Sequence, residues 1–261
     1  MKLLVNGIEL YYELHGKGKP LVLIGGFTSD VSLWRTVLHT LSSHYQVLVF
    51  DNRGSGQSSS PDEPYKIEDM AQDVISLILE LKLEKPHILG HSMGGAIAQT
   101  IAHRHGDLID KLIICNSMIR LGFASRLMKN RMIERRRANT DPMEIIETKL
   151  PWIFSKDFLQ DKARVEELTS FELMHPYSQS FVGFKRQLDA LFDFDSRKWH
   201  HQIPHQTLVI GSEEDAICLQ DTTTLGKNIP NAQFVNFPKV GHAPHLEKPH
   251  EFKHAVCEFL R

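Results

Sequence analysis

The sequence predicts an α/β fold built on a mostly parallel, doubly wound sheet. Short apolar runs with strand character recur along the chain, at residues 21–24, 46–50, 86–89, 111–115, 207–210 and 233–237. Helical patterns lie between these runs. The clearest one, over residues 67–81, places apolar side chains on a single face: Met70, Val74, Leu77, Ile78 and Leu81. Strands that alternate with helices indicate parallel pairing, with functional residues at the carboxyl ends of the strands.

Two regions depart from this alternation. Residues 3–6 and 8–15 flank Asn6-Gly7, a pair typical of a tight β-hairpin, so we expect these two strands to be antiparallel. Between about Met118 and Lys198, no run has convincing strand character. We therefore expect a helical segment there, inserted into the sheet domain.

Composition limits the possible classes of function. The chain has 261 residues, 41% of them hydrophobic, which suffices for the core of one α/β domain with an insertion. Its formal net charge of −2 gives no general attraction to nucleic acid or acidic membranes. The first residues turn polar too soon for a signal peptide, and no apolar run approaches the ~18 residues of a membrane span.

Cysteine usage and the motifs that are missing add further expectations. Cys115, Cys218 and Cys257 are widely spaced and form no C-x-x-C pair, which is typical of reduced thiols in a cytoplasmic protein. The sequence contains neither a metal-ligand spacing nor a dinucleotide fingerprint. We expect no metal and no other cofactor.

The most informative motif is Gly90-His91-Ser92-Met93-Gly94, which follows the apolar run at residues 86–89 and precedes a helical pattern at residues 96–102. A serine on a sharp turn from strand to helix projects its hydroxyl clear of both elements. Glycines two positions before and after it avoid collisions of a Cβ atom with the neighbouring strand and helix. The motif therefore predicts a nucleophilic serine.

Acidic residues and a histidine follow Ser92 in the order expected for a catalytic triad. The predicted strand at residues 207–210 leads into three acidic residues at 213–215, and the strand at 233–237 leads into Gly241-His242. A strand leads into this loop and a glycine directly precedes His242, which makes it a better candidate for the base than His245.

Together these motifs resemble those of the α/β-hydrolase superfamily. Residues 51–58, Asp-Asn-Arg-Gly-Ser-Gly-Gln-Ser, are similar to its D-x-R-G-x-G-x-S turn, and residues 241–249 resemble its catalytic-histidine loop. The resemblance covers residues 1–118 and 199–261. It implies an eight-stranded, mostly parallel sheet flanked by helices. It also implies a helical cap at residues 119–198, inserted after the sixth strand, that covers the active site and sets the choice of substrate.

The resemblance also implies the roles of the site residues. Ser92 would attack the substrate, and His242 would take its proton and later deliver it to the leaving group. Asp215 would orient the imidazole, since the spacing typical of the family favours it over Glu213 and Glu214.

The oxyanion hole requires two N–H donors. We expect one from Met93, which follows the nucleophile, and one from Phe27 in the loop after the strand at residues 21–24. Relatives usually have a histidine where this chain has Gly25. Because both donors are main-chain N–H groups, we expect the oxyanion hole to be kept. The missing histidine affects the shape of the acyl pocket instead.

The expected cap contains most candidates for substrate contact. Its stretch at residues 150–154 resembles the enol-lactonase-like branch, so Trp152 and Phe154, with Gly26 of the oxyanion loop, are the substrate-binding candidates. Further apolar candidates are Phe158, Phe171, Met174, Tyr177, Phe181, Phe184 and Leu188. As a group they favour an apolar acyl site over a site for sugar or phosphate.

The beginning of the cap is strongly basic. Residues 120–137 contain one acid, Glu134, and seven cations: Arg120, Arg126, Lys129, Arg131, Arg135, Arg136 and Arg137. A solvated helix face is one interpretation. The other is a docking surface, formed by Arg131, Arg135 and Arg136, for an acidic partner or carrier protein.

The sequence thus favours a cofactor-independent serine hydrolase that cleaves carboxylic esters or lactones through an acyl-serine intermediate. Three alternatives stay open. They are an esterase for acyl chains on an acidic carrier, similar to the biotin-pathway methyl-esterases, a hydrolase of carbon–carbon bonds in ring-cleavage products, and a non-catalytic ligand receptor. We expect a small-molecule substrate, no binding of nucleic acid or membranes, and a monomer or homodimer.

Overall fold

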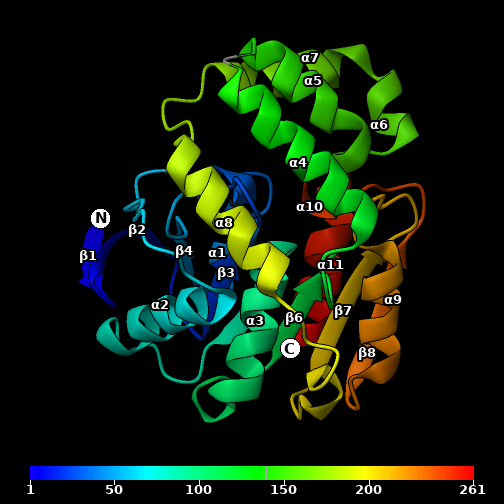
Figure 1. Cartoon of the computed structure of the whole chain (residues 1–261). Coiled ribbons are helices and arrows are strands. Elements are labelled where there is room, and N and C mark those ends of the chain that lie inside the picture. The colour runs from blue at the N-terminus through cyan, green and yellow to red at the C-terminus, as the bar shows by residue number, and fades with distance from the viewer. Residues whose placement is uncertain (139) are drawn as a thin grey trace.

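The computed structural model describes residues 1–138 and 140–261, while Asn139 and the side chain of Lys129 lie outside the described residues. Eight strands form one sheet in the order β1-β2-β4-β3-β5-β6-β7-β8 (Figure 1). Their bounds are β1 Lys2–Val5, β2 Ile8–His15, β3 Pro20–Ile24, β4 Gln46–Phe50, β5 His87–His91, β6 Leu112–Cys115, β7 Thr207–Ser212 and β8 Ala232–Phe237. β2 pairs antiparallel with β1 and β4, and the remaining pairs are parallel. The predicted fold class is confirmed, and each strand lies within about two residues of its predicted range.

Helices cover both faces of the sheet. The sheet domain contains α1 (Leu38–Ser42), α2 (Ile67–Glu80), α3 (Met93–Arg104), α9 (Leu219–Asn228), α10 (Pro244–Glu247) and α11 (Pro249–Leu260), with short 3-10 turns η1 (Val31–Trp34), η2 (Gly106–Leu108) and η3 (His200–Gln202). Residues of α2, α3 and α9 belong to one hydrophobic core, and residues of α1 and α11 to the other.

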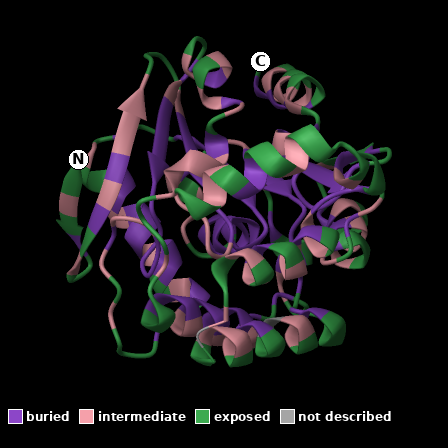
Figure 2. Cartoon of the chain, turned by 90° about the horizontal axis from the view of Figure 1, so that it is seen from above, coloured by how far each residue is buried: buried purple, intermediate pink, exposed green. Residues whose placement is uncertain are grey.

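The central strands are continuous apolar runs because both of their faces are buried. In β3, Val22 and Ile24 point into one core, and Leu21 and Leu23 point into the other. Figure 2 shows these strands as buried, whereas the hairpin of β1 and β2 mixes buried, intermediate and exposed residues. The sheet therefore provides a rigid edge at the carboxyl ends of its parallel strands.

The chain between β6 and β7 forms the predicted helical insertion. In the described residues it contains α4 (Phe123–Arg137), α5 (Pro142–Ile153), α6 (Lys156–Gln160), α7 (Lys162–Leu173) and α8 (Phe181–Asp193), which we call the cap helices. They lie over one end of the sheet (Figure 1). Ala190 and Leu191 at the end of α8 belong to the main core, so packing does not change sharply at residue 198. The division into a core at 1–118 and 199–261 and a cap at 119–198 stays a prediction.

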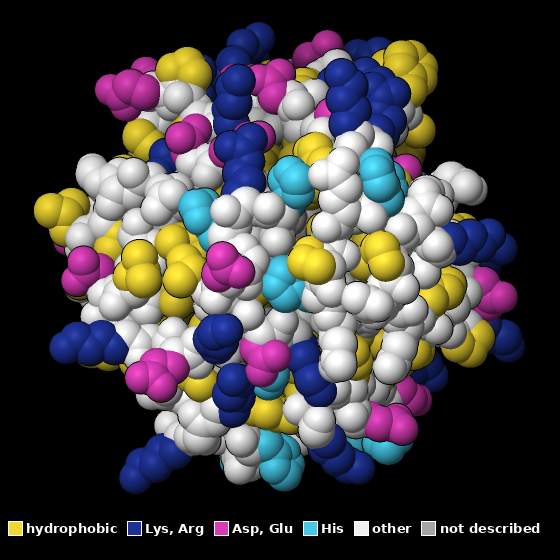
Figure 3. Space-filling model, turned by 90° about the horizontal axis from the view of Figure 1, so that it is seen from below, with side chains coloured by type: hydrophobic (Ala, Val, Ile, Leu, Met, Phe, Trp, Pro, Cys, Tyr) yellow, Lys and Arg dark blue, Asp and Glu magenta, His cyan; other side chains and the backbone are white. Residues whose placement is uncertain are grey.

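The face opposite the cap helices shows no large patch of one charge (Figure 3). On the face opposite the cap helices, Lys and Arg side chains lie interspersed with Asp, Glu, His and hydrophobic side chains (Figure 3), in keeping with the net charge of −2. None of the helices in the described residues has the length and apolar character that a membrane crossing requires.

Candidate active site

Ser92 lies between β5 and α3 with φ 55° and ψ −116°. Such a left-handed conformation is costly for a residue with a side chain and persists only where the surroundings impose it. A Cβ on Gly90 would collide with the carbonyl oxygen of Gly94, and a Cβ on Gly94 would collide with the carbonyl oxygen of Ile24. The serine motif thus has the strand, turn and helix that the sequence predicts.

His242 and Asp215 meet from the loops that follow β8 and β7. His242 Nδ1 lies 2.9 Å from Asp215 Oδ1, and both side chains are buried. Asp215 Oδ1 also accepts hydrogen bonds from the backbone N–H groups of Ile217 (2.9 Å) and Cys218 (3.1 Å). Burial acts to raise the pKa of Asp215, but His242 and these N–H groups outweigh it and hold the pKa below its ordinary value. An ionised Asp215 favours the proton on His242 Nδ1, which leaves Nε2 as the basic nitrogen.

Asn116, which sequence reasoning missed, supports the acid from a third strand. Its side-chain amide donates to Asp215 Oδ2 (2.9 Å) and to the carbonyl oxygen of Gly241 (3.4 Å). Asn116 directly follows β6 and has φ 42°, in the left-handed region that asparagine tolerates better than most residues. The sequence does contain a signal for it, a polar residue at the carboxyl end of a buried strand. Because β6 is the neighbour of β7, that residue lies close to the loop that carries Asp215.

The loop that carries His242 is attached to the cap helices. The backbone N–H of His242 donates to the carbonyl oxygen of Ile153 at the end of α5 (2.7 Å). The N–H of Gly241 donates to Glu247 Oε1 (2.9 Å), and Glu247 Oε2 accepts from the hydroxyl of Ser155 (2.5 Å). Glu247 therefore joins the histidine loop to the start of α6, a role that sequence reasoning also missed.

The competing candidates lie elsewhere. His245 is fully buried and is absent from the lining of the cavity described below. Glu213 and Glu214 accept hydrogen bonds from backbone N–H groups of other loops rather than from a histidine. His91 does line that cavity, but its Nε2 is engaged with the carbonyl oxygen of His242 (2.8 Å).

The predicted oxyanion loop lies against Ser92, the predicted nucleophile. A Cβ on Gly26 would come within 3.3 Å of Ser92 Cβ, so the main chain there passes directly beside the serine. Phe27 follows Gly26, and Met93 is the first residue of α3, whose N–H has no acceptor within the helix. A Cβ on Gly25 would make only ordinary contacts, at 3.5 Å or more, so close packing does not require this glycine.

Ser92 and His242 line a cavity of about 690 Å³ between the sheet edge and the cap helices. The predicted residues that line it are Gly26, Phe27, Phe154, Phe171, Tyr177 and Phe181. Of the other apolar candidates, Phe158, Phe184 and Leu188 are buried in side-chain packing, and Met174 is exposed.

The structure does not bring Trp152, a predicted substrate contact, to the cavity. Trp152 is partly exposed and does not line the cavity, although its neighbours Ile153 and Phe154 do. Helix α5 turns Ile145, Lys149 and Ile153 toward the cavity, at intervals of four residues. Trp152 follows Ile145 by seven residues, which places it near the edge of this stripe in an ideal helix, and it still does not line the cavity.

The arginines of the basic run do not form one surface. Arg131 is exposed and pairs with Glu134 (2.7 Å), while Arg135 pairs with Glu144 (2.6 Å). Arg136 turns inward and lines the cavity, so its expected place on a docking surface is wrong. Docking of an acidic carrier stays a prediction for Arg131 and Arg135.

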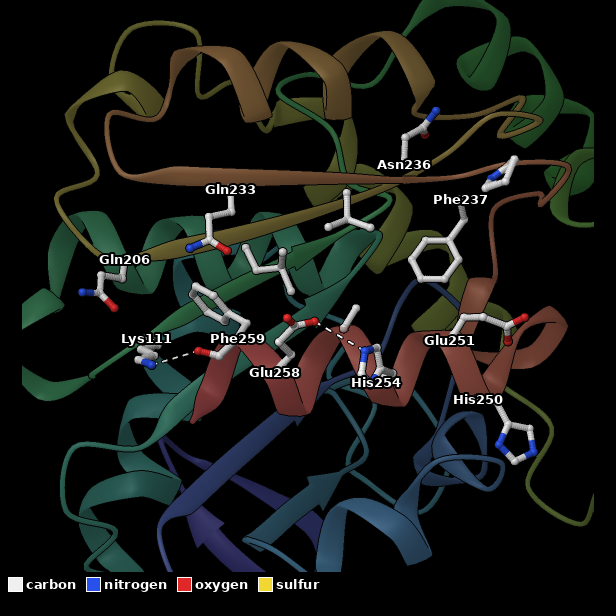
Figure 4. Close-up of a pocket in the computed structure, with 14 residues that line it drawn as sticks. Lys111, Gln206, Gln233, Asn236, Phe237, His250, Glu251, His254, Glu258 and Phe259 are labelled. Atoms are coloured by element: carbon white, nitrogen blue, oxygen red, sulfur yellow. Dashed lines mark hydrogen bonds and ion pairs between the residues drawn. The ribbon is translucent and has the colours of Figure 1, made fainter.

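A second hollow, of about 900 Å³, lies between β8 and α11 (Figure 4). Lys111 Nζ donates to the carbonyl oxygen of Phe259 (2.8 Å) there, and His254 pairs with Glu258 (3.5 Å). Its lining residues include histidines and acids but no serine, threonine or cysteine. Although it is the larger hollow, it lacks the nucleophile that acyl transfer needs.

Asp215, Cys218 and His242 place possible metal-ligand atoms within 4.8 Å of one another. The hydrogen bonds of the acid and the imidazole already explain this grouping, because Asp215 Oδ1 and His242 Nδ1 bond each other. The arrangement fits a proton-transfer pair better than a metal centre, whose ligands would each direct a lone pair at the ion.

Comparison with known proteins agrees with this fold. A family model of the alpha/beta hydrolase fold matches residues 19–249, so the chain belongs to the α/β-hydrolase family, and the resemblance drawn from the motifs is confirmed. Relatives named as a hydrolase and an enol-lactonase support hydrolase activity for this chain.

Three of these relatives match nearly the whole chain. "Putative carbamate hydrolase RutD" of Caulobacter segnis is 27% identical over 271 residues, which cover 98% of this chain and 97% of that protein. The structure of an enol-lactonase from Burkholderia xenovorans matches with a TM-score of 0.89 and 28% identity, over 100% of this chain and 99% of that one. A thermophilic esterase from Thermogutta terrifontis, solved with malate bound, matches with a TM-score of 0.87 and 28% identity, over 100% and 97%.

Proposed function

We propose that this hydrolase cleaves carboxylic esters or lactones without a cofactor, through an acyl-serine intermediate on Ser92. The observation that carries the proposal is the hydrogen bond between His242 and Asp215 at the wall of a cavity that Ser92 also lines. The relatives named as an enol-lactonase and an esterase support the same class of substrate.

In the first half-reaction, His242 Nε2 takes the hydroxyl proton as Ser92 Oγ attacks the acyl carbon. Asp215 stabilises the imidazolium that forms, and the N–H groups of Phe27 and Met93 receive the negative charge on the carbonyl oxygen. When the tetrahedral intermediate collapses, the bond to the alcohol oxygen breaks and this oxygen takes the proton from His242. In a lactone the leaving oxygen stays attached to the acyl chain.

In the second half-reaction, water takes the place of the alcohol. His242 removes a proton from the water molecule as its oxygen attacks the acyl carbon. The bond to Ser92 Oγ then breaks, and the serine recovers its proton from the imidazolium. The products are a carboxylic acid and the unchanged enzyme, so no redox step or cofactor takes part.

The lining of the cavity supports an acyl group of moderate size. Side chains of the cap helices contribute most of its apolar surface, among them Met128, Met132, Ile145, Phe154 and Phe171. Apolar walls with a few polar groups are typical of sites for small organic molecules.

Four alternatives predict different results on a panel of substrates. A carbamate, suggested by the name of one relative, would react through the same attack of Ser92. A carrier-linked ester has less support, because Arg131 and Arg135 are each paired with an acid. Carbon–carbon bond hydrolysis needs a ring-cleavage product as substrate, and a receptor would turn over none of these compounds.

Rates on esters, lactones, carbamates and a ring-cleavage product, measured with wild type, Ser92→Ala and Ser29→Ala, test the proposal. Ser29 also lines the cavity, which makes it a matched control. We expect ester or lactone turnover to fall about 10⁴-fold to 10⁶-fold in Ser92→Ala and to change little in Ser29→Ala. Retention of most activity by Ser92→Ala would overturn the acyl-serine mechanism, and inactivity of the wild type on the whole panel would favour the receptor.

A further inference from the structure

One face of α4 borders the cavity. Met128, Met132 and Arg136 all line it and are spaced four residues apart, the interval that places side chains on the same side of a helix. Arg131 and Arg135 belong to other faces and bond acids outside the cavity. An arginine thus continues a stripe that is otherwise made of methionine.

The charges around this cavity do not cancel. Its lining contains three cations (Arg35, Arg136 and Lys149) and two carboxylates (Asp30 and Glu172). Lys149 forms an ion pair with Glu172, and His175 pairs with Asp30 (3.2 Å). Burial lowers the pKa of Arg35, and the nearby carboxylates of Glu167, Glu172 and Asp30 oppose this effect. Arg136 has no ion-pair partner in the part of the chain that the structure describes. One positive charge is therefore in excess.

Neighbouring groups position the Arg136 side chain, but no carboxylate among the described residues neutralises its charge. Its guanidinium lies 4.3 Å from the ring centroid of Phe184 and donates one hydrogen bond, to the carbonyl oxygen of Gln179 (3.2 Å). Its Nε is buried and has no partner among the described residues. The Phe184 ring lies 5.0 Å from that of Phe27, so the cation is two ring contacts away from the oxyanion loop.

A half-buried cation without an anion is disfavoured, and its partial burial accordingly lowers the pKa of Arg136. The charge becomes favourable when an anion fills the cavity. A guanidinium is well suited to a carboxylate, which it can bind through two parallel hydrogen bonds. A single excess charge matches a monoanion better than a phosphate ester, whose second charge would face Asp30 and Glu172.

We propose that Arg136 binds a carboxylate at the far end of the acyl chain, so that the preferred substrates are half-esters of dicarboxylic acids or lactones with a free carboxylate. This inference rests on the proposed function for the reaction at Ser92. It assigns Arg136 to the choice of substrate, whereas Ser92, His242 and Asp215 carry the chemistry.

Two matched esters test the proposal: p-nitrophenyl hydrogen glutarate, which carries a carboxylate, and p-nitrophenyl methyl glutarate, in which a methyl ester masks it. Their kcat/KM values are measured for wild type, Arg136→Gln, Arg136→Lys and the control Arg131→Gln. We expect Arg136→Gln to lose about 10-fold to 100-fold on the anionic ester, mainly through KM, and less than threefold on the neutral one. Arg136→Lys should recover part of the loss, and Arg131→Gln should resemble wild type.

An equal loss on both esters, or no loss on the anionic one, would overturn the assignment of Arg136. Binding to the inactive Ser92→Ala variant separates this result from a failure of the proposed function. In calorimetric titration with monomethyl glutarate, we expect Ser92→Ala to bind at least 10-fold more tightly than Ser92→Ala/Arg136→Gln. If that difference is present while no ester is turned over by the wild type, the carboxylate site stands and the hydrolytic assignment fails.

Discussion

The side chain of His245 is fully buried, although a histidine has two polar ring nitrogens. In the described part of the chain neither of its ring nitrogens has a hydrogen-bond partner, and its ring packs against Trp34 and Phe252. Burial, and then the charges of His91, His242 and Arg35, hold its pKa well below the ordinary value of 6.5. The folded chain therefore keeps His245 neutral under conditions that protonate it in the unfolded chain.

The His245→Leu variant should be less sensitive to acid than the wild type. Because the unfolded state binds a proton at about pH 6.5 and the folded state does not, the free energy of unfolding falls as the pH drops below that value. By pH 5, the free energy of unfolding should therefore have fallen by about 2 kcal/mol less in His245→Leu than in the wild type. Urea unfolding at pH 7.5, 6 and 5 measures the effect, with the exposed His250→Leu as control. Parallel pH curves for His245→Leu and wild type would contradict this account.

At the residue scale, the sequence predicts groups that belong to local motifs. Ser92 has glycines at fixed distances, and a strand and a glycine precede His242, so a short window is enough to recognise each. Asn116 bonds an acid 99 positions away, and Glu247 bonds a serine 92 positions away, which no local window reveals. Arg136 continues a stripe with Met128 and Met132, but the basic run around it hides that pattern.

At the scale of elements, the decisive contact joins the histidine loop to the cap helices. Glu247 accepts hydrogen bonds from Gly241 in the loop and from both the N–H and the hydroxyl of Ser155, the N-cap of α6. The N–H of His242 bonds the end of α5. The position of the base therefore depends on the same segment that lines the cavity.

The Glu247→Ala variant should weaken both the fold and the site. Buried N–H and hydroxyl groups would lose their acceptor, which should lower the free energy of unfolding by about 1–3 kcal/mol. The loosened loop should lower kcat/KM on p-nitrophenyl esters about 10-fold, because the base would no longer be held in one position. Urea unfolding and initial rates measure the two effects. Glu251→Ala, an exposed residue of α11, is the control, and equal behaviour of the two variants would refute the link.

Strands and helices could be predicted from the sequence where burial alone decides which residues are apolar. The parallel strands are buried on both faces, so their sequences are continuous apolar runs with clear ends. The interior of the helical insertion was less predictable, because its helices divide their apolar residues between internal packing and the cavity. Phe154 lines the cavity, whereas Trp152, two positions earlier, does not.

At the scale of the whole molecule, the sheet order explains how distant motifs form one site. β5, β6, β7 and β8 are consecutive neighbours, with Ser92, Asn116 and Asp215 directly after or close to the ends of the first three and His242 in the loop that follows β8. The cap helices close this edge and supply the arginine proposed to select the substrate. The residues proposed for the chemistry thus follow strands of the sheet, and the residue proposed for selection lies in the insertion, which also helps to hold the histidine loop.

The central claim is that Ser92 becomes acylated, and the intact mass of the protein after treatment with a fluorophosphonate tests it most directly. We expect the wild type to gain the mass of one phosphonyl group, located by peptide mapping on Ser92. Labelling should be far slower in His242→Ala, which lacks the base, and absent in Ser92→Ala. Labelling of Ser92→Ala at the wild-type rate, or an adduct mapped to another residue, would contradict the account.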